Sequence, residues 1–259
     1  MLLRRGFRPR PWPPDLPFPP GFDEARRERL DRCLDHYAFR LFLRGAIQHA
    51  SGFRPAEATR YVQGPAARAM AEELVALGLI ERVGRSRYRL LHPPRSFGGT
   101  LEWYLARVLA VRLGFDAATA LRFGAKGVGG DLDVVAAAEG RLLYVEAKSS
   151  PPRQIAEGEV RAFFDRLEAL RPDLAFFVVD TALRLGDKVL PMLVAEAARR
   201  AGRPPAPRRV VREVWTLTPR LFAVGAKGHL GTNLAVAVAE GLRALVPPVL
   251  EVRPEETRR

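Results

Sequence analysis

The chain has 259 residues and a hydrophobic fraction of 47%, which is enough for one large domain or two modest ones. Its 42 basic and 29 acidic residues give a formal net charge of +13, which suits a polyanionic partner such as nucleic acid. The single cysteine, Cys33, excludes an intramolecular disulfide, and no apolar run is long enough to span a bilayer. Met1 to Arg5 lacks the apolar core of a secretory signal, so a cytoplasmic protein is expected.

Prolines are concentrated in residues 8–20, near the N-terminus. Each proline lacks a backbone N–H and fixes φ, so this density excludes a helix or a central strand. The segment predicts an extended, polyproline-type arm over residues 1–21. Trp12 and Phe18 are the side chains that would attach the arm to the body; otherwise the arm is disordered.

The next stretch is dominated by helical patterns. Apolar residues recur at helical spacing from Asp23 to His49 and predict one long helix. Pro55 and the Gly64-Pro65 pair each begin a further helix. Two alternating strands follow, residues 79–83 and 87–91, separated by a turn.

Helices followed by a two-stranded hairpin resemble a winged helix-turn-helix domain, here residues 22–95. In that architecture the third helix enters a major groove and the hairpin contacts the backbone. The resemblance therefore implies nucleic-acid contacts for a set of polar and basic residues at the start of the third helix and on the hairpin: Arg60, Gln63, Arg68, Arg85, Arg87 and Arg89. Protein contacts or dimerisation are the alternative use of such a domain.

Beyond a proline-containing linker, the pattern changes to helices alternating with strands. A helix is predicted over residues 101–113 and a strand over 115–123. The glycine-rich segment 124–130 lacks the Gly-Lys-Ser/Thr of a phosphate loop. Its Lys126 is interpreted as a contact to nucleic-acid phosphates, with a solvated turn as the alternative.

Residues 131–148 show the most regular alternation in the chain and predict a β-hairpin with a two-residue turn at Glu139-Gly140. Leu132, Val134 and Ala136 share one face. The polar residues of both strands share the other face: Asp131, Asp133, Tyr144, Glu146 and Lys148. The turn fixes the register, so Asp133 faces Glu146 and Asp131 faces Lys148.

Two opposed carboxylates make this face a candidate metal site. Opposed side chains lie about 4.5–5.5 Å apart at Cβ, and carboxylates that close repel unless a cation or a proton lies between them. A hard divalent ion with oxygen ligands suits that gap, and Lys148 would reach the same ligand. The chain has four lysines among its 42 basic residues, so a lysine here indicates a need for a compact ammonium. Charges that merely face solvent are the alternative.

Asp133 and the Glu146-Ala147-Lys148 triplet after a short hairpin resemble the signature of the PD-(D/E)XK nuclease superfamily, which has a restriction-endonuclease-like fold. The resemblance covers roughly residues 97–182. It implies Mg²⁺ or Mn²⁺ held by Asp133 and Glu146, with the carbonyl of Ala147 as a third ligand and Lys148 beside the attacking water.

Two positions leave alternatives within this resemblance. Gly129-Gly130 stands where the family has its proline, so both Asp131 and Asp133 are candidates for the metal ligand; Asp133 is preferred because it opposes Glu146. A glutamate on the helix before the hairpin adds a metal contact in many relatives, which implies that role for Glu102. Its alternative role is a favourable acid in the first helical turn.

The predicted fold class is α/β, with a restriction-endonuclease-like mixed sheet flanked by helices in residues 96–202. A small, mostly α winged-helix domain precedes it. Further elements complete the expected αβββαβ core and its extension: a helix over 155–170, a strand over 174–179 and a helix over 189–201. Residues 203–259 add strands and a helix of unknown role, for which we expect strand extension or a homodimer contact.

The expected activity is that of a metal-dependent endonuclease that hydrolyses phosphodiester bonds in DNA. One alternative is a catalytically silent DNA-binding regulator or assembly factor. The other is an RNA-cleaving defence nuclease. The presence of Asp133, Glu146 and Lys148 together favours an enzyme over a silent relative.

Overall fold

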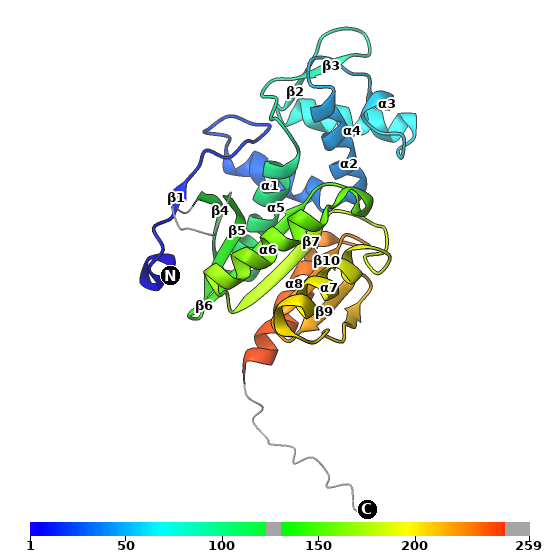
Figure 1. The fold of residues 1–259 in the computed structure, drawn as a ribbon. Coiled ribbons are helices and arrows are strands. Elements are labelled where there is room, and N and C mark those ends of the chain that lie inside the picture. Colours follow the sequence, from blue (N-terminus) through cyan, green and yellow to red (C-terminus); the bar gives the residue numbers. More distant parts are fainter. Residues whose placement is uncertain (123–130, 247–259) are drawn as a thin grey trace, which may run out of the picture.

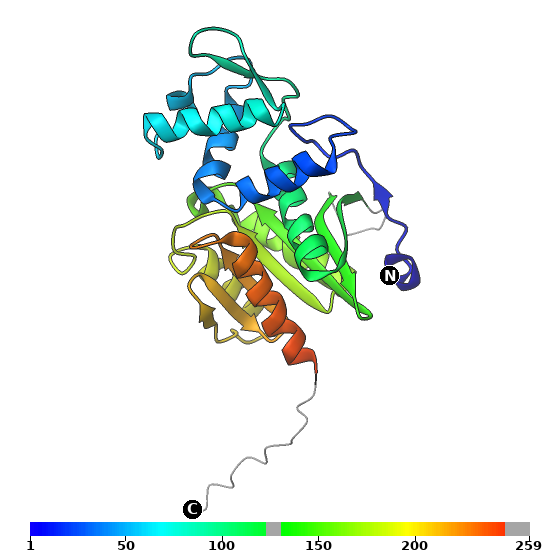
Figure 2. The same cartoon turned by 180° about the vertical axis from the view of Figure 1, so that it is seen from behind.

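The computed structural model describes residues 1–122 and 131–246. Helices at the N-terminal end lie above an eight-stranded mixed sheet that carries helices on both faces (Figures 1 and 2). The glycine-rich segment 124–130, and with it Lys126, lies outside the described residues. Within the described ranges, every helix is too short or too polar to cross a bilayer.

The first two helices are α1 (Glu24–Leu34) and α2 (Tyr37–Gln48). The prediction of one long helix is therefore wrong. The guanidinium of Arg40 donates to the carbonyl of Leu34, the last residue of α1. His36, the residue just before α2, has an extended backbone. A buried arginine thus uses the carbonyl groups that a continuous helix would have kept for itself.

The rest of the N-terminal part follows the predicted order of two helices and a hairpin: α3 (Pro55–Ala58), α4 (Gly64–Ala76), β2 (Ile80–Arg82) and β3 (Tyr88–Leu90). Gly45 of α2 explains how closely α2 and α3 pack. A Cβ at this position would lie 1.6 Å from the carbonyl oxygen of Ala58, so only glycine fits.

The main sheet has the strand order β1-β4-β5-β6-β7-β10-β9-β8. Its strands are β1 (Arg10–Pro11), β4 (Asp116–Arg122), β5 (Asp131–Ala138), β6 (Arg141–Lys148), β7 (Leu174–Val179), β8 (Arg208–Val211), β9 (Val214–Thr218) and β10 (Leu221–Gly225). The β6–β7 and β7–β10 pairs are parallel and the others are antiparallel. The carboxyl ends of β6, β7 and β10 therefore meet at one edge of the sheet.

Helices cover both faces of this sheet. On the face seen in Figure 1 lie α6 (Glu157–Leu170) and α7 (Val189–Ala201); behind it lie α5 (Gly98–Arg107) and α8 (Leu230–Leu245) (Figure 2). The two faces of β7 show this arrangement, because Phe176 packs in one hydrophobic cluster and Phe177 in the other. A strand buried on both faces reads as a continuous apolar run, as β7 does.

The N-terminal arm is attached to the body. Its Arg10–Pro11 strand pairs with the edge strand β4, and the N–H of Trp12 donates to the carbonyl of Ala120 at 3.1 Å. Phe18 is buried and packs edge-on against Trp103. Proline is confined to such edge positions because it cannot donate to a ladder.

The sheet continues beyond residue 202. Leu221 to Gly225 pairs with β7 in parallel, and β9 and β8 extend the sheet from there. Strand extension, one of the two expectations for residues 203–259, is therefore confirmed for this part. The N-terminal helices also share the hydrophobic core of the sheet, since Phe42 and Leu74 belong to the same cluster as Val145 of β6.

Candidate active site

The hairpin of β5 and β6 has the predicted register from its turn to Val134, and the predicted Asp133–Glu146 and Asp131–Lys148 pairs lie beyond the end of that ladder. Its ladder pairs Val134 with Val145 and ends with Ala138 opposite Arg141. Glu139 and Gly140 form the turn with φ values of 51° and 74°, the left-handed pair that a two-residue type I′ turn requires. The register that the sequence predicted from this turn is therefore confirmed up to Val134.

The ladders are interrupted at Asp133. The β4–β5 pairing passes from Val134 to Leu132 and omits Asp133, and the β5–β6 pairing begins at Val134. Opposite the gap, Ala120 has a φ of 51°. The carboxylate of Asp133 accepts the N–H of Ala147 at 2.7 Å and so replaces the missing backbone acceptor.

This irregularity corrects the predicted face of Leu132. Leu132 packs in the cluster that contains Val135 and Tyr144, whereas Val134 and Ala136 pack in the other. The strict alternation that grouped Leu132 with Val134 is wrong. Its cause is the break at Asp133, where neither neighbouring strand fixes the backbone as a ladder would.

Glu146 is 2% exposed and is bonded from several directions. The guanidinium of Arg166 on α6 donates to its Oε2 at 2.8 Å, and the hydroxyl of Tyr144 donates to the same oxygen. The ammonium of Lys148 lies 2.9 Å from Oε1. A buried carboxylate thus has the charged and hydrogen-bonding partners that burial demands.

Lys148 lies between two carboxylates. Its Nζ is 2.9 Å from Glu146 and 3.0 Å from Glu159, which stands in the first turn of α6 and accepts the N–H of Ala156. Burial lowers the pKa of Lys148, but the two glutamates outweigh it and leave that pKa raised. The side chain, 16% exposed, is therefore a charged and confined ammonium.

Glu102 lies on α5, which covers the face of the sheet opposite α6, and its charge interacts with Asp131, Glu146 and Lys148. Burial, and then the charges of Asp131 and Glu146, raise the pKa of Glu102 to about 7, against the effect of Lys148. The sequence placed Glu102 in the first turn of a helix from Leu101, as a metal contact or an acid favourable to the helix dipole, but α5 begins at Gly98 and Glu102 lies beyond its first turn, so the dipole role is wrong. The charges that shift the pKa of Glu102 are those at the end of the hairpin: Asp131, Glu146 and Lys148.

Asp133 completes the cluster. Burial raises its pKa well above the usual range, and the nearby charges of Glu146 and Glu102 add to that effect. The N–H of Ala147 and the charge of Lys148 oppose it. The predicted residues Asp133, Glu146 and Lys148 are thus brought together, with Glu102 within their electrostatic reach.

The donor set suits a hard divalent cation, with a restriction. In the described part of the chain, no three His, Cys, Asp or Glu side chains form a group that could hold a metal ion by themselves. Mg²⁺ commonly uses one or two protein carboxylates and keeps several waters, so Asp133 and Glu146 fit that pattern. A cation would also relieve the repulsion that raises the pKa of Asp133.

Three contacts of this site were not found from the sequence: Tyr144, Glu159 and Arg166. Alternation had placed Tyr144 on the face of Glu146, which is the signal for its hydrogen bond. Glu159 and Arg166 are seven residues apart on α6, so helical periodicity puts both on one face. Only the packing of α6 against the hairpin shows that this face meets Glu146.

Two of the predicted nucleic-acid residues that the structure describes line one cavity. Arg68 and Arg85 line a cavity of about 500 Å³ together with Arg54 and Arg82. The other predicted residues have local roles: Arg89 pairs with Glu81 at 2.5 Å, Arg87 donates to the carbonyl of Gly52, Arg60 lies over the Tyr61 ring, and Gln63 begins α4. Of the predicted set, Arg68 and Arg85 are the members that share a cavity.

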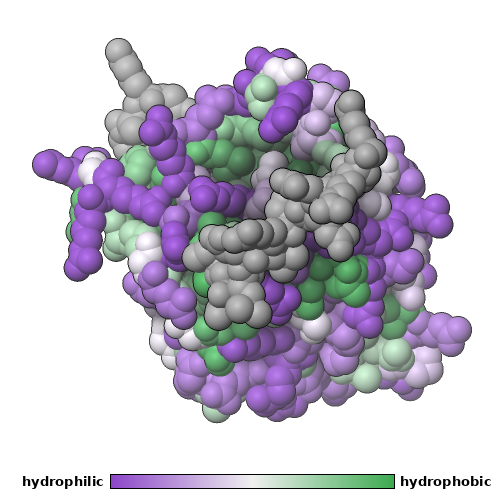
Figure 3. Space-filling model, turned by 90° about the horizontal axis from the view of Figure 1, so that it is seen from below, coloured by the Kyte–Doolittle hydropathy of each residue, from purple (hydrophilic) through white to green (hydrophobic). Residues whose placement is uncertain are grey.

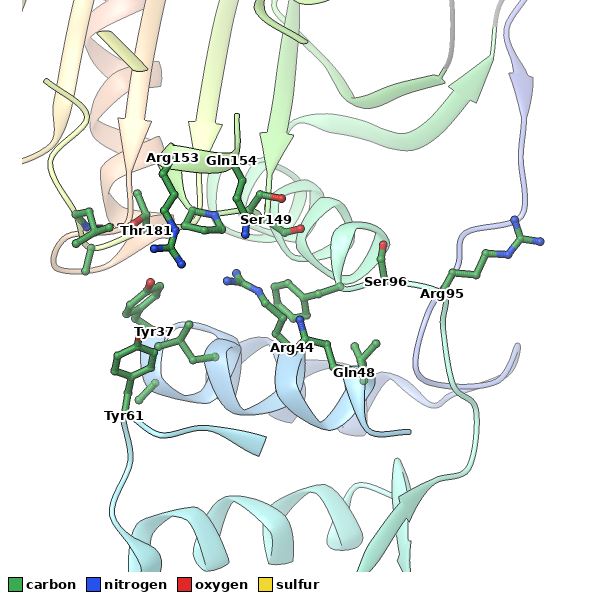
Figure 4. Close-up of a pocket in the computed structure, with 18 residues that line it drawn as sticks. Tyr37, Arg44, Gln48, Tyr61, Arg95, Ser96, Ser149, Arg153, Gln154 and Thr181 are labelled. Atoms are coloured by element: carbon green, nitrogen blue, oxygen red, sulfur yellow. Dashed lines mark hydrogen bonds between the residues drawn. The ribbon is translucent and has the colours of Figure 1, made fainter. Parts of the chain in front are cut away.

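A larger cleft of about 870 Å³ lies between α2 and the carboxyl ends of β6 and β7 (Figure 4). Its polar lining includes Tyr37, Arg44, Gln48, Tyr61, Arg153 and Gln154. Ser149 and Ser150 belong to the same lining and follow Lys148 directly. On the face of the molecule seen from below, hydrophilic residues predominate, with smaller apolar areas between them (Figure 3).

No protein-family model matches the chain, and no curated protein matches its sequence. The crystal structure of protein VC1899 from Vibrio cholerae aligns with a TM-score of 0.52 at 12% identity, over 91% of this chain and 60% of that one. Can2 from Sulfobacillus thermosulfidooxidans, in complex with cyclic tetra-adenylate, aligns with a TM-score of 0.49 at 13% identity, over 92% of this chain and 58% of that one. The chain therefore spans about 60% of the length of these proteins, and its likeness to VC1899 is one of fold alone.

Proposed function

We propose that the chain is a metal-dependent nuclease of the PD-(D/E)XK type. The observation that carries this proposal is the buried group at the end of the catalytic hairpin, where Asp133, Glu146 and Lys148 meet. The element order α5-β4-β5-β6-α6-β7 supports it, because it matches the αβββαβ core expected from the resemblance. DNA is the proposed substrate.

Asp133, Glu146 and the carbonyl of Ala147 would hold Mg²⁺ or Mn²⁺, with Glu102 in contact directly or through water. When bound, such an ion supplies Lewis-acid polarisation of a phosphoryl oxygen and lowers the pKa of a bound water. Among the described residues, Tyr144 and Arg166 both bond to Oε2 of Glu146. The other oxygen, Oε1, pairs with the ammonium of Lys148 and is the one better placed to bind a cation as well.

Lys148 is the group that we assign to stabilising the transition state. Its ammonium is held by Glu146 and Glu159, so it is oriented before substrate arrives. A preorganised donor of this kind acts where negative charge develops and costs no reorganisation during the reaction. Arg166 acts through Glu146 and is a positioning residue.

The N-terminal helices and hairpin would supply affinity for the nucleic acid as a winged-helix unit. Support comes from the cavity that groups Arg54, Arg68, Arg82 and Arg85 between α4 and the β2–β3 hairpin. Among these, Arg82 is already paired with Glu72. The net charge of +13 gives the same expectation for the whole chain.

A catalytically silent nucleic-acid-binding protein is the second candidate. The observation that favours it is the pairing of Glu146 with both Arg166 and Lys148, which neutralises the carboxylate without a metal ion. In a silent protein these ion pairs would be the final state of the site. In an enzyme the cation would join them.

The test is cleavage of supercoiled, linear and single-stranded DNA and of RNA, each with Mg²⁺, Mn²⁺ or EDTA. We expect cleavage with a metal ion and none in EDTA. Glu146→Gln should abolish cleavage and keep nucleic-acid binding, and the exposed Glu157→Gln on α6 is the matched control. A wild-type rate for Glu146→Gln would refute the catalytic assignment, and an inactive wild-type protein under every condition would favour the silent alternative.

A further inference from the structure

The cleft at the carboxyl ends of β6 and β7 is continuous with the proposed catalytic strand. Ser149 and Ser150 extend the chain from Lys148 into the cleft wall. From the neighbouring strand, the N–H of Asp180 donates to the carbonyl of Lys148 at 2.9 Å. A ligand in the cleft would therefore lie beside the end of β6, the strand that carries Glu146 and Lys148.

Arg44 is held in place at the opposite wall of the cleft. Its Nη2 lies 2.7 Å from Asp180, and its guanidinium packs 5.2 Å from the centre of the Phe97 ring. Its Nε is buried and has no hydrogen-bond partner among the described residues. That Nε has no solvent access, so an anion in the cleft would meet the exposed part of the guanidinium, whose side chain is 18% exposed and whose orientation Asp180 and Phe97 already fix.

Arg153 extends into the same space from the other wall (Figure 4). Arg44 comes from α2, and Arg153 comes from the segment that follows β6. Two guanidinium groups that share a cleft repel each other, so an anion between them would be favourable. The phosphate of a nucleotide has the charge and the acceptor oxygens for this position.

Two tyrosines lie close together at one end of the cleft (Figure 4). Tyr61 is 68% exposed, and the guanidinium of Arg60 lies 5.0 Å from the centre of its ring. Arg40 lies 5.5 Å from the centre of the Tyr37 ring. An exposed aromatic ring with a cation near one face is a common platform for a stacked base.

We propose that this cleft binds an unpaired stretch of nucleic acid, with a base on the exposed ring of Tyr61, next to Tyr37, and phosphates on Arg44 and Arg153. The inference rests on the proposed nuclease function and specifies its substrate site. A base can stack on a side chain only when it has left its duplex, because paired bases already stack on their neighbours. The tyrosines therefore select a single strand, or a strand end or bubble, over continuous duplex.

The test is equilibrium binding of the full chain in EDTA, measured by fluorescence anisotropy with a labelled single-stranded DNA 12-mer and with the same strand in a duplex. Tyr61→Ala should weaken single-strand binding about 5- to 150-fold, because stacking of a base contributes that much. Tyr61→Phe should restore it, since phenylalanine keeps the ring. Duplex binding should change little in both variants.

Arg44→Gln should weaken single-strand binding and lower the slope of log K against log salt by about 0.7, the value for one phosphate contact. Arg243→Gln is the matched control, because Arg243 lies on α8 and its side chain is 80% exposed. Arg44 contacts the buried Asp180, so its variant needs a melting curve. The exposed Tyr61 is for that reason the deciding position.

Two outcomes overturn the proposal: Tyr61→Ala binding the single strand as tightly as Arg243→Gln does, or duplex binding that is equally sensitive to Tyr61→Ala. Because the measurement contains no metal, it is separate from catalysis. Binding with the expected pattern but without cleavage in any metal would reject the nuclease proposal and keep this one. Cleavage of single strands that Tyr61→Ala leaves unchanged at subsaturating substrate would reject this one alone.

Discussion

The buried ion pair between Arg40 and Asp180 gives a sharp prediction of stability. Both side chains are fully buried, and Nε of Arg40 lies 2.9 Å from Oδ1 of Asp180. Arg44 binds the other oxygen of Asp180 at 2.7 Å. Asp180→Ala would leave Arg40 buried without a carboxylate partner among the described residues, with the carbonyl groups of Leu34 and Asp35 as its remaining hydrogen-bond acceptors there.

Removing one partner of a buried pair costs about 3–5 kcal/mol, because the remaining charge is left uncompensated. For a chain of this size, that corresponds to a fall in Tm of roughly 6–20 °C. Urea denaturation followed by circular dichroism would measure the change in the free energy of unfolding. The control is Glu28→Ala, which removes an exposed pair with Arg32 at 4.0 Å and should cost less than about 1 kcal/mol.

Arg40→Met should cost less than Asp180→Ala, since Arg44 still compensates Asp180. The double variant Arg40→Met with Asp180→Leu should recover much of the loss, because it removes the fully buried charge of Arg40 and leaves only the partly exposed Arg44 without its carboxylate. A loss below about 1 kcal/mol for Asp180→Ala would refute the reasoning. A double variant no more stable than Asp180→Ala would refute it as well.

Three further predictions follow from single contacts. Lys148→Arg should reduce the rate of single-turnover cleavage about as much as Lys148→Ala does, roughly 100- to 1000-fold, because the ammonium is confined 2.9 and 3.0 Å from two glutamates. An arginine variant that keeps most of the wild-type rate would contradict this prediction. Replacing Arg54, Arg68 and Arg85 by Ala should lower the salt slope of duplex binding by up to about 2.7, measured by anisotropy, and an unchanged slope would exclude this cavity as a phosphate site. Burial opposes the lowered pKa of Asp173, but hydrogen bonds from a backbone N–H and an arginine outweigh it. Because that pKa is lowered on folding, its contribution is complete above the ordinary value of 3.8 and is lost as pH falls through the lowered pKa, so Asp173→Asn should destabilise the protein in urea more at pH 7 than at pH 3.

The hairpin was predictable because its information is local. A two-residue turn fixes the register, so the neighbourhood of Asp133, Glu146 and Lys148 followed from a stretch of 18 residues. The extent of the strands agrees with the prediction as well. Alternation could not predict the gap in the ladder at Asp133. That gap lies opposite Ala120, whose positive φ belongs to the neighbouring strand β4 and leaves no trace in the sequence of the hairpin.

The errors came from contacts between distant residues. The division of α1 from α2 depends on Arg40, whose partner Asp180 is 140 positions away. Periodicity gave one continuous helix because the segment on both sides of the break has helical spacing. An arginine in such a pattern reads as a surface residue, and only the folded sheet shows that it is buried.

Net charge predicted a polyanionic partner but not where it binds, because ion pairing decides which arginines are available. Arg89 of the hairpin was predicted to bind phosphates, yet it already lies 2.5 Å from Glu81. Arg44 was not predicted, and it lines the cleft of about 870 Å³ with a side chain that is 18% exposed. The two differ in their nearest carboxylate. Glu81 is exposed at the surface with Arg89, whereas Asp180 is buried and fixes Arg44 from behind, which leaves the cleft side of the guanidinium for a ligand. A search for binding residues in a basic chain should therefore begin with arginines anchored by buried acids, not with those in the densest run of charge.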